Sequence, residues 1–92
     1  MELTSKPTIQ EGYKAETFDG EVILYTVAGT KAVYLNGTAQ LIWLLCQQDL
    51  NVGEIQEALI EQYPQQAEQI RSDVIATLED LQEKGVITLL DQ

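Results

Sequence analysis

Short apolar runs separated by turn residues fill the first third of the chain. Tyr13–Phe18 and Glu21–Val27 flank Asp19-Gly20, a pair that tolerates the positive φ angles of a two-residue hairpin. A third run, Lys31–Leu35, follows after a further turn. Because Val22–Val27 of the middle run is almost entirely β-branched or aromatic, we expect a central strand covered on both faces. The pattern predicts a three-stranded antiparallel meander.

Beyond Leu35 the apolar residues recur at helical spacing. Asn36 can cap a helix that runs to about Gln47, whose broad apolar face would comprise Leu41, Ile42, Leu44 and Leu45. Asn51 starts a second helix, and Glu54 completes the pattern of a capping box. Its inner side would carry Val52, Ile55, Leu59 and Tyr63, and Pro64 would end it.

The last third of the chain predicts a third helix, from about Ala67 to Lys84, with Gly85 as its left-handed cap. Its apolar stripe is Ile70, Val74, Leu78 and Leu81, and Val86–Leu90 leaves as a short tail that could pack or pair. Strands followed by helices indicate an α+β domain with the outline of a winged helix-turn-helix. We expect a flexible N-terminal arm over residues 1–12 and one domain over residues 13–92.

The charge balance narrows the choice of partners. Fifteen acidic residues face five basic ones, which gives a net charge of −10 at pH 7. Such a surface repels nucleic acids and anionic membranes. In the third helix Arg71 and Lys84 stand against five carboxylates (Glu68, Asp73, Glu79, Asp80, Glu83). A DNA-binding winged-helix regulator is therefore an alternative that the charges disfavour.

Missing residue types argue against an enzyme. The chain has no His and a single Cys46, which excludes His-based nucleophilic pairs, His-containing or thiolate metal sites and an internal disulfide. We therefore expect no catalytic residues, metal or cofactor. Cys46 and Trp43 are expected in the core. The N-terminus resembles no signal peptide and no apolar run is long enough to span a bilayer, so a cytoplasmic location is expected.

The third strand offers a binding edge. An outer strand of a meander leaves a row of main-chain groups unpaired, and only Lys31 blunts the apolar run Ala32-Val33-Tyr34-Leu35. An extended peptide could pair with this edge. A proline at Val33 is then expected to weaken binding and spare the fold. The strand could instead be merely short and solvated, or pair with a second copy in a homodimerising structural module.

The third helix can supply a wall beside this strand. At 100° per residue, one shoulder of its apolar stripe carries Asp73, Thr77, Asp80 and Lys84, and the other carries Arg71, Ile75 and Gln82. The first suits a basic or hydroxyl-bearing peptide side chain, and Ile75 on the second suits an apolar one. The sequence leaves open which shoulder faces the sheet.

These elements resemble a known family. The run Val33-Tyr34-Leu35-Asn36-Gly37-Thr38-Ala39-Gln40-Leu41-Ile42-Trp43 is similar to the strand-to-helix signature of PqqD-like proteins. So are Val52-Gly53-Glu54-Ile55, Leu59, Tyr63-Pro64, Asp73-Val74, Leu78, Leu81 and Lys84-Gly85-Val86-Ile87. The similarity spans roughly residues 13–89.

The resemblance implies a function and a site. PqqD-like domains are non-catalytic, winged-helix-like recognition elements of ribosomally synthesised, post-translationally modified peptides. They bind a precursor's leader region along the third strand against the third helix. They act as chaperones for a modifying enzyme, often a radical S-adenosylmethionine enzyme, although cyclases, proteases and dehydratases also use them. The implied peptide-binding residues are Lys31, Ala32, Val33, Tyr34, Leu35, Asp73, Val74, Thr77, Leu78, Asp80, Leu81 and Lys84.

Overall fold

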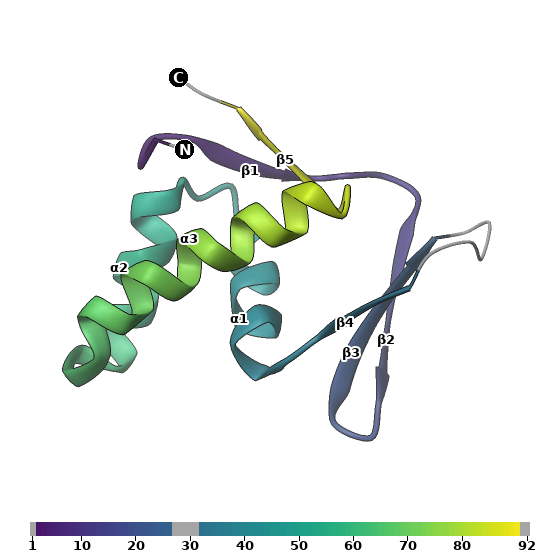
Figure 1. Cartoon of the computed structure of the whole chain (residues 1–92), viewed down its shortest axis with the longest axis horizontal. Helices are drawn as coiled ribbons and strands as arrows, with labels where there is room; N and C mark the ends of the chain where they lie inside the picture. Colours follow the sequence, from purple (N-terminus) through teal and green to yellow (C-terminus); the bar gives the residue numbers. More distant parts are fainter. Residues whose placement is uncertain (1, 27–31, 91–92) are drawn as a thin grey trace.

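A three-stranded antiparallel meander and a three-helix unit make up most of the computed structural model, which describes residues 2–26 and 32–90 (Figure 1). The meander has the order β2 (Tyr13–Phe18), β3 (Glu21–Thr26) and β4 (Ala32–Leu35). The turn between β2 and β3 has positive φ angles of 53° at Asp19 and 80° at Gly20, as the hairpin prediction requires. The expected strand ends at Val27 and Lys31 lie outside the described residues.

The three helices follow in the predicted order: α1 (Gly37–Cys46), α2 (Val52–Gln62) and, after the 3₁₀ turn η1 (Pro64–Gln66), α3 (Ala67–Glu83). Asn36 caps α1 by accepting a hydrogen bond from the Ala39 N–H at 2.8 Å. Asn51 and Glu54 form the expected capping box of α2. Gly85, with φ of 80°, follows the end of α3. The predicted α+β class is confirmed.

The prediction of a flexible arm over residues 1–12 is wrong for its middle part. Lys6–Ile9 forms strand β1, which pairs antiparallel with β5 (Ile87–Leu90) in a separate two-stranded sheet. The segment before β1 also contacts α2, because the Ser5 and Leu3 carbonyls accept hydrogen bonds from the Val52 and Gly53 N–H groups at 2.9 Å. These are two of the donors that a helix start leaves without an intrahelical partner. The order of this segment thus depends on partners distant in sequence.

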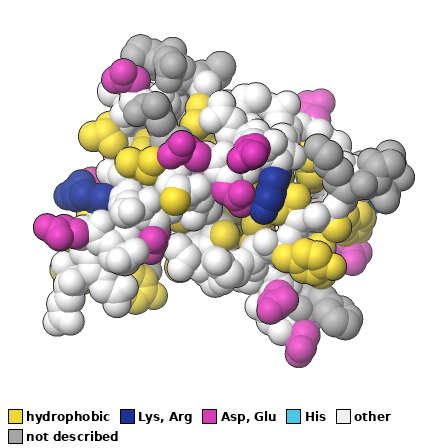
Figure 2. Space-filling view, in the orientation of Figure 1, with side chains coloured by type: hydrophobic (Ala, Val, Ile, Leu, Met, Phe, Trp, Pro, Cys, Tyr) yellow, Lys and Arg dark blue, Asp and Glu magenta, His cyan; other side chains and the backbone are white. Residues whose placement is uncertain are grey.

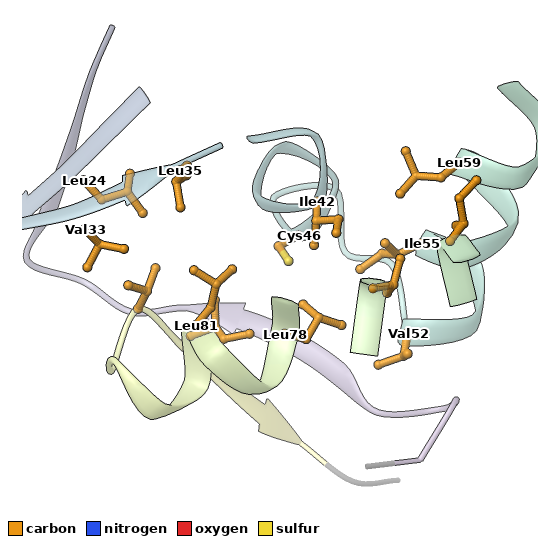
Figure 3. Close-up of a cluster of buried hydrophobic side chains, with 14 residues drawn as sticks. Leu24, Val33, Leu35, Ile42, Cys46, Val52, Ile55, Leu59, Leu78 and Leu81 are labelled. Atoms are coloured by element: carbon orange, nitrogen blue, oxygen red, sulfur yellow. The ribbon is translucent and has the colours of Figure 1, made fainter. Parts of the chain in front are cut away.

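One core joins the meander to the helices. Leu24, Val33 and Leu35 project from the sheet toward α3, where the whole predicted stripe is buried, as Figure 3 shows for Leu78 and Leu81. Cys46 is 4% exposed, as expected of a core residue. The core residues are Leu24, Val33, Leu35, Ile42, Cys46, Val52, Ile55, Leu59, Ile70, Val74, Leu78, Leu81, Val86 and Ile87.

Four apolar side chains lie farther out than the sequence indicated. Leu41 and Leu44, expected on the apolar face of α1, are 40% and 51% exposed, because α1 packs mainly through Ile42 and Cys46. Tyr63 is 48% exposed, since α2 has already ended at Gln62. Trp43 is only partly buried, and its buried Nε1 has no hydrogen-bond partner among the described residues. Among the described helices, none has the length and apolar character needed to cross a membrane.

Candidate functional site

Strand β4 has one free edge. In the part of the chain that the structure describes, β4 pairs only with β3, so one row of its main-chain groups has no strand beside it. Side chains alternate along the strand: Val33 and Leu35 are 6% and 2% exposed, whereas Tyr34 is 69% exposed. An added strand would therefore have the helices on one face and solvent on the other.

The hairpin fixes which main-chain groups of β3 point toward β4. Phe18 and Glu21 close the two-residue turn, so this pair exchanges both of its hydrogen bonds. Because narrow and wide pairs alternate along antiparallel strands, Glu21 and Ile23 direct their N–H and C=O groups toward β2. The main-chain groups of Val22 and Leu24 are directed toward β4.

The same alternation assigns the free edge of β4. Val22 pairs with Leu35 and Leu24 pairs with Val33, so these β4 residues bond to β3. The N–H and C=O groups of Ala32 and Tyr34 point away from the sheet. A proline at Val33 would thus break the internal ladder and disturb a buried side chain. The expectation that this substitution would spare the fold is wrong, and Tyr34 is the position that presents a donor to a partner.

The structure distinguishes the two shoulders of α3. Arg71 faces α2: its guanidinium lies 3.5 Å from the Glu57 carboxylate, and its carbonyl accepts a hydrogen bond from the Gln56 side chain at 3.3 Å. Asp73 instead lines a cavity together with Gly37 at the start of α1. Since β4 runs directly into α1, the shoulder of Asp73, Thr77, Asp80 and Lys84 is the one turned toward the β4 end of the molecule.

This first shoulder is polar and predominantly acidic. Asp73 and Thr77 are partly buried, and the Asp73 carboxylate accepts a hydrogen bond from the Gln69 amide at 2.8 Å. Asp80 and Lys84 are exposed and form an ion pair at 2.9 Å. In Figure 2, acidic side chains lie beside and above the basic side chain near the centre of this face. A ligand here would meet more negative than positive charge.

The remaining residues implied by the resemblance have different positions. Val74, Leu78 and Leu81 are at most 1% exposed, so their side chains hold α3 in the core and have no surface to offer a peptide. The Val33 and Leu35 side chains are buried as well. Lys31 lies outside the described residues. The accessible set comprises the outward main-chain groups of Ala32 and Tyr34, the Tyr34 side chain and the first shoulder of α3.

A cavity of about 350 Å³ lies where the free edge of β4 ends. Its lining comes from the first turn of α1, the end of α2 and the first half of α3: Gly37, Thr38, Leu41, Leu59, Tyr63, Gln66, Ile70 and Asp73. The sequence analysis did not identify this cavity, because it depends on how three helices pack. Two larger hollows, of about 560 and 550 Å³, are lined by other segments and include neither a β4 residue nor the first turn of α1 that follows β4.

The one cysteine of the chain, Cys46, is buried. Burial raises the pKa of the Cys46 thiol to about 12, so this sulfur stays protonated at neutral pH and is a poor nucleophile. No three His, Cys, Asp or Glu side chains gather into a potential metal site within residues 2–26 and 32–90. An open strand edge, a polar helix flank and a partly apolar cavity lie near the junction of β4 and α1.

Two comparisons with known proteins give matches, one by sequence family and one by fold. The family model described as "Coenzyme PQQ synthesis protein D (PqqD)" matches residues 21–87. A solved structure titled "TbiB1 in Complex with the TbiA(beta) Leader Peptide" superposes with a TM-score of 0.77 at 20% sequence identity. That similarity covers 92% of this chain and 99% of the other, and it establishes a common fold. No curated protein sequence gives a significant match.

Proposed function

The chain belongs to the PqqD family, and from this premise we propose that it is a non-catalytic adaptor for a ribosomally made precursor peptide. It binds the leader region of that peptide as an added strand along β4, against the first shoulder of α3. It then presents the precursor to a modifying enzyme. The observation that carries the proposal is the free edge of β4, which presents the main-chain groups of Ala32 and Tyr34 beside a polar helix flank.

Strand addition uses this edge in two ways. Main-chain hydrogen bonds to Ala32 and Tyr34 supply affinity that does not depend on the leader's side chains. Side chains supply the specificity: every second leader residue points toward α3, and the others lie beside Tyr34 on the outer face of the sheet. The similar solved structure is itself a complex with a leader peptide, which supports a peptide as the ligand.

The adaptor role follows from the resemblance to PqqD-like proteins. A domain that holds the leader and also docks on the enzyme raises the local concentration of the core peptide at the active site. By this resemblance the partner is a peptide-modifying enzyme, such as one of the radical S-adenosylmethionine type. The binding domain itself then needs neither metal nor cofactor.

Proline substitution at Tyr34 tests the binding mode. Tyr34→Pro removes a donor from the free edge and leaves the β3–β4 ladder bonds in place, so calorimetric affinity for a synthetic leader should fall about tenfold or more. The probe is the leader half of a precursor peptide encoded beside the gene for this chain. Tyr34→Ala, which keeps the N–H, separates the loss of the donor from the loss of the ring.

Ala15→Pro is the matched control. By the same alternation, Ala15 directs its N–H away from β3 on the opposite edge of the sheet, and its side chain is exposed. This variant should bind like the wild type. Equal affinities for the Tyr34→Pro and Ala15→Pro proteins would contradict pairing at β4. Sedimentation at several concentrations then shows whether the edge pairs with a second copy instead.

A further inference from the structure

We propose that the cavity at the end of β4 is a specificity pocket that takes one large apolar side chain of the bound peptide, with a basic residue next to it held by Asp73. This inference rests on the proposed function, because the peptide on β4 is what delivers these side chains to the cavity. It adds the class of sequence that the adaptor reads: a bulky aliphatic or aromatic residue adjacent to Lys or Arg. The position of the cavity, the apolar part of its lining and the charge at its rim carry the argument.

The position of the cavity makes it reachable from β4. Gly37 and Thr38 line it, and only Asn36 separates them from the last residue of the strand, Leu35. A peptide paired with Ala32 and Tyr34 therefore needs to extend by only two or three residues past the strand end to arrive at its mouth, at about 3.3 Å per extended residue. The same peptide can use the free edge and the cavity together.

The lining suits an apolar side chain. Leu59 and Ile70 are 5% and 8% exposed, whereas Leu41 and Tyr63 leave 40% and 48% of their surface accessible. Covering such exposed apolar surface with a ligand is favourable, because it removes the surface from water. A dry apolar cavity of about 150 Å³ in another protein is large enough for benzene, so about 350 Å³ accommodates an aromatic or branched side chain.

Gly37 keeps the mouth of the cavity wide. Its φ lies outside the left-handed region, and an added Cβ would have no atom within 4 Å. Neither backbone strain nor packing within the described structure therefore requires glycine here, although glycine is a poor helix former. A variant with a larger residue at this position should fold, because its Cβ meets no clash, and the new side chain would extend from the wall of the cavity.

Asp73 supplies the charge preference. The basic side chains in the described salt bridges are Lys6, Arg71 and Lys84, and each is paired with a carboxylate other than Asp73. The Asp73 carboxylate accepts a hydrogen bond from the neutral Gln69 amide, which leaves its charge uncompensated by these ion pairs. A Lys or Arg adjacent to the apolar residue would reach this carboxylate at the rim. An acidic residue in that place would be repelled.

Selection from a peptide library measures this preference directly on the protein. Random 12-residue peptides displayed on phage are selected against the full chain, with the Tyr34→Pro protein used to remove peptides that do not need β4. The expected consensus is a bulky apolar residue with Lys or Arg within two positions. Replacing the apolar residue by Ala in a synthetic consensus peptide should weaken calorimetric binding roughly 10- to 100-fold.

Two variants connect the consensus to the cavity. The new side chain of Gly37→Leu competes for the space in the cavity. On this variant, replacing the apolar peptide residue by Ala should weaken binding less than about threefold. On the exposed control Gln48→Leu the same replacement should weaken binding as much as on the wild type. On Asp73→Lys, selection should favour Asp or Glu in place of the basic residue. Thermal unfolding of each variant checks that it is folded.

The outcomes separate this inference from the proposed function. Peptides that require Tyr34 but share no apolar–basic pattern, and that bind Gly37→Leu as tightly as the wild type, overturn the pocket and leave strand addition standing. An acidic residue in the wild-type consensus, or a basic residue that persists in the peptides selected on Asp73→Lys, also overturns it. If the removal step leaves no peptide, because every peptide that binds the wild type also binds the Tyr34→Pro protein, strand addition at β4 itself fails.

Discussion

At the scale of single residues, Cys46 shows how burial controls chemistry in this domain. The thiol lies in the core at the end of α1, and burial raises its pKa to about 12. The unfolded chain would ionise the same thiol near pH 8.5. The protonated form is common to both states below that pH. Above it the unfolded state alone releases a proton, so this residue lowers the free energy of unfolding as the pH rises from about 8.5 toward 12.

The Cys46 thiol should therefore react with 5,5′-dithiobis(2-nitrobenzoic acid) at pH 8 only when the domain opens. We expect reaction at least about 100-fold slower than for the chain in denaturant, since burial blocks access and suppresses the thiolate. Absorbance at the thiolate product's band gives both rates. Comparable rates in the folded and denatured states would contradict the buried position. Cys46→Ala supplies the blank.

Residue identity alone could not assign the direction of a backbone donor. The run Ala32–Leu35 showed that this strand was apolar and open, but the inward groups at Val33 and the outward groups at Tyr34 follow from the register that the Asp19-Gly20 turn sets. A turn longer by one residue would exchange the two sets. The prediction about a proline at Val33 was wrong for this reason.

At the scale of elements, the first turn of α2 shows local and distant contributions at one helix start. Asn51 and Glu54 satisfy donors through the capping box, which the sequence revealed. The carbonyls of Leu3 and Ser5 accept hydrogen bonds from two further N–H groups of this turn, and the sequence did not reveal these contacts. Local spacing can identify a cap, whereas a contact between segments nearly fifty residues apart depends on the assembled fold.

Asn51→Ala should lower the free energy of unfolding by about 1 kcal/mol, because it leaves the Glu54 N–H without its acceptor. Urea denaturation followed by circular dichroism measures the change. Ser72→Ala, an exposed substitution in the middle of α3, serves as the control and should leave the value within about 0.5 kcal/mol. An Asn51→Ala protein as stable as this control would show that the cap contributes nothing.

The pairing of β1 with β5 was beyond prediction for the same physical reason. Lys6–Ile9 contains Pro7 and has no apolar alternation, so nothing in the segment itself indicates a strand. Its partner Ile87–Leu90 lies about eighty residues away, and the two meet only after α3 has returned the chain. The meander and the helices, whose signals are local, were predicted with their order and nearly their boundaries.

At the scale of the whole molecule, the candidate site combines features that different signals revealed. The strand edge and the polar shoulder of α3 follow from periodicity in the sequence. The choice between the two shoulders, and the cavity between α1, α2 and α3, required the packing of the helices. The net charge of −10 is consistent with a basic or neutral partner and disfavours a nucleic acid.

The most direct test of strand addition is a map of backbone amide shifts in the ¹⁵N-labelled chain during titration with the synthetic leader of the neighbouring precursor. The account predicts saturable shifts concentrated in Ala32–Leu35 and along Asp73–Lys84, with the Tyr34 amide among the largest and the β2 edge unchanged. Shifts centred on Tyr13–Phe18, or on the outer side of α2, would place the peptide elsewhere and contradict the account.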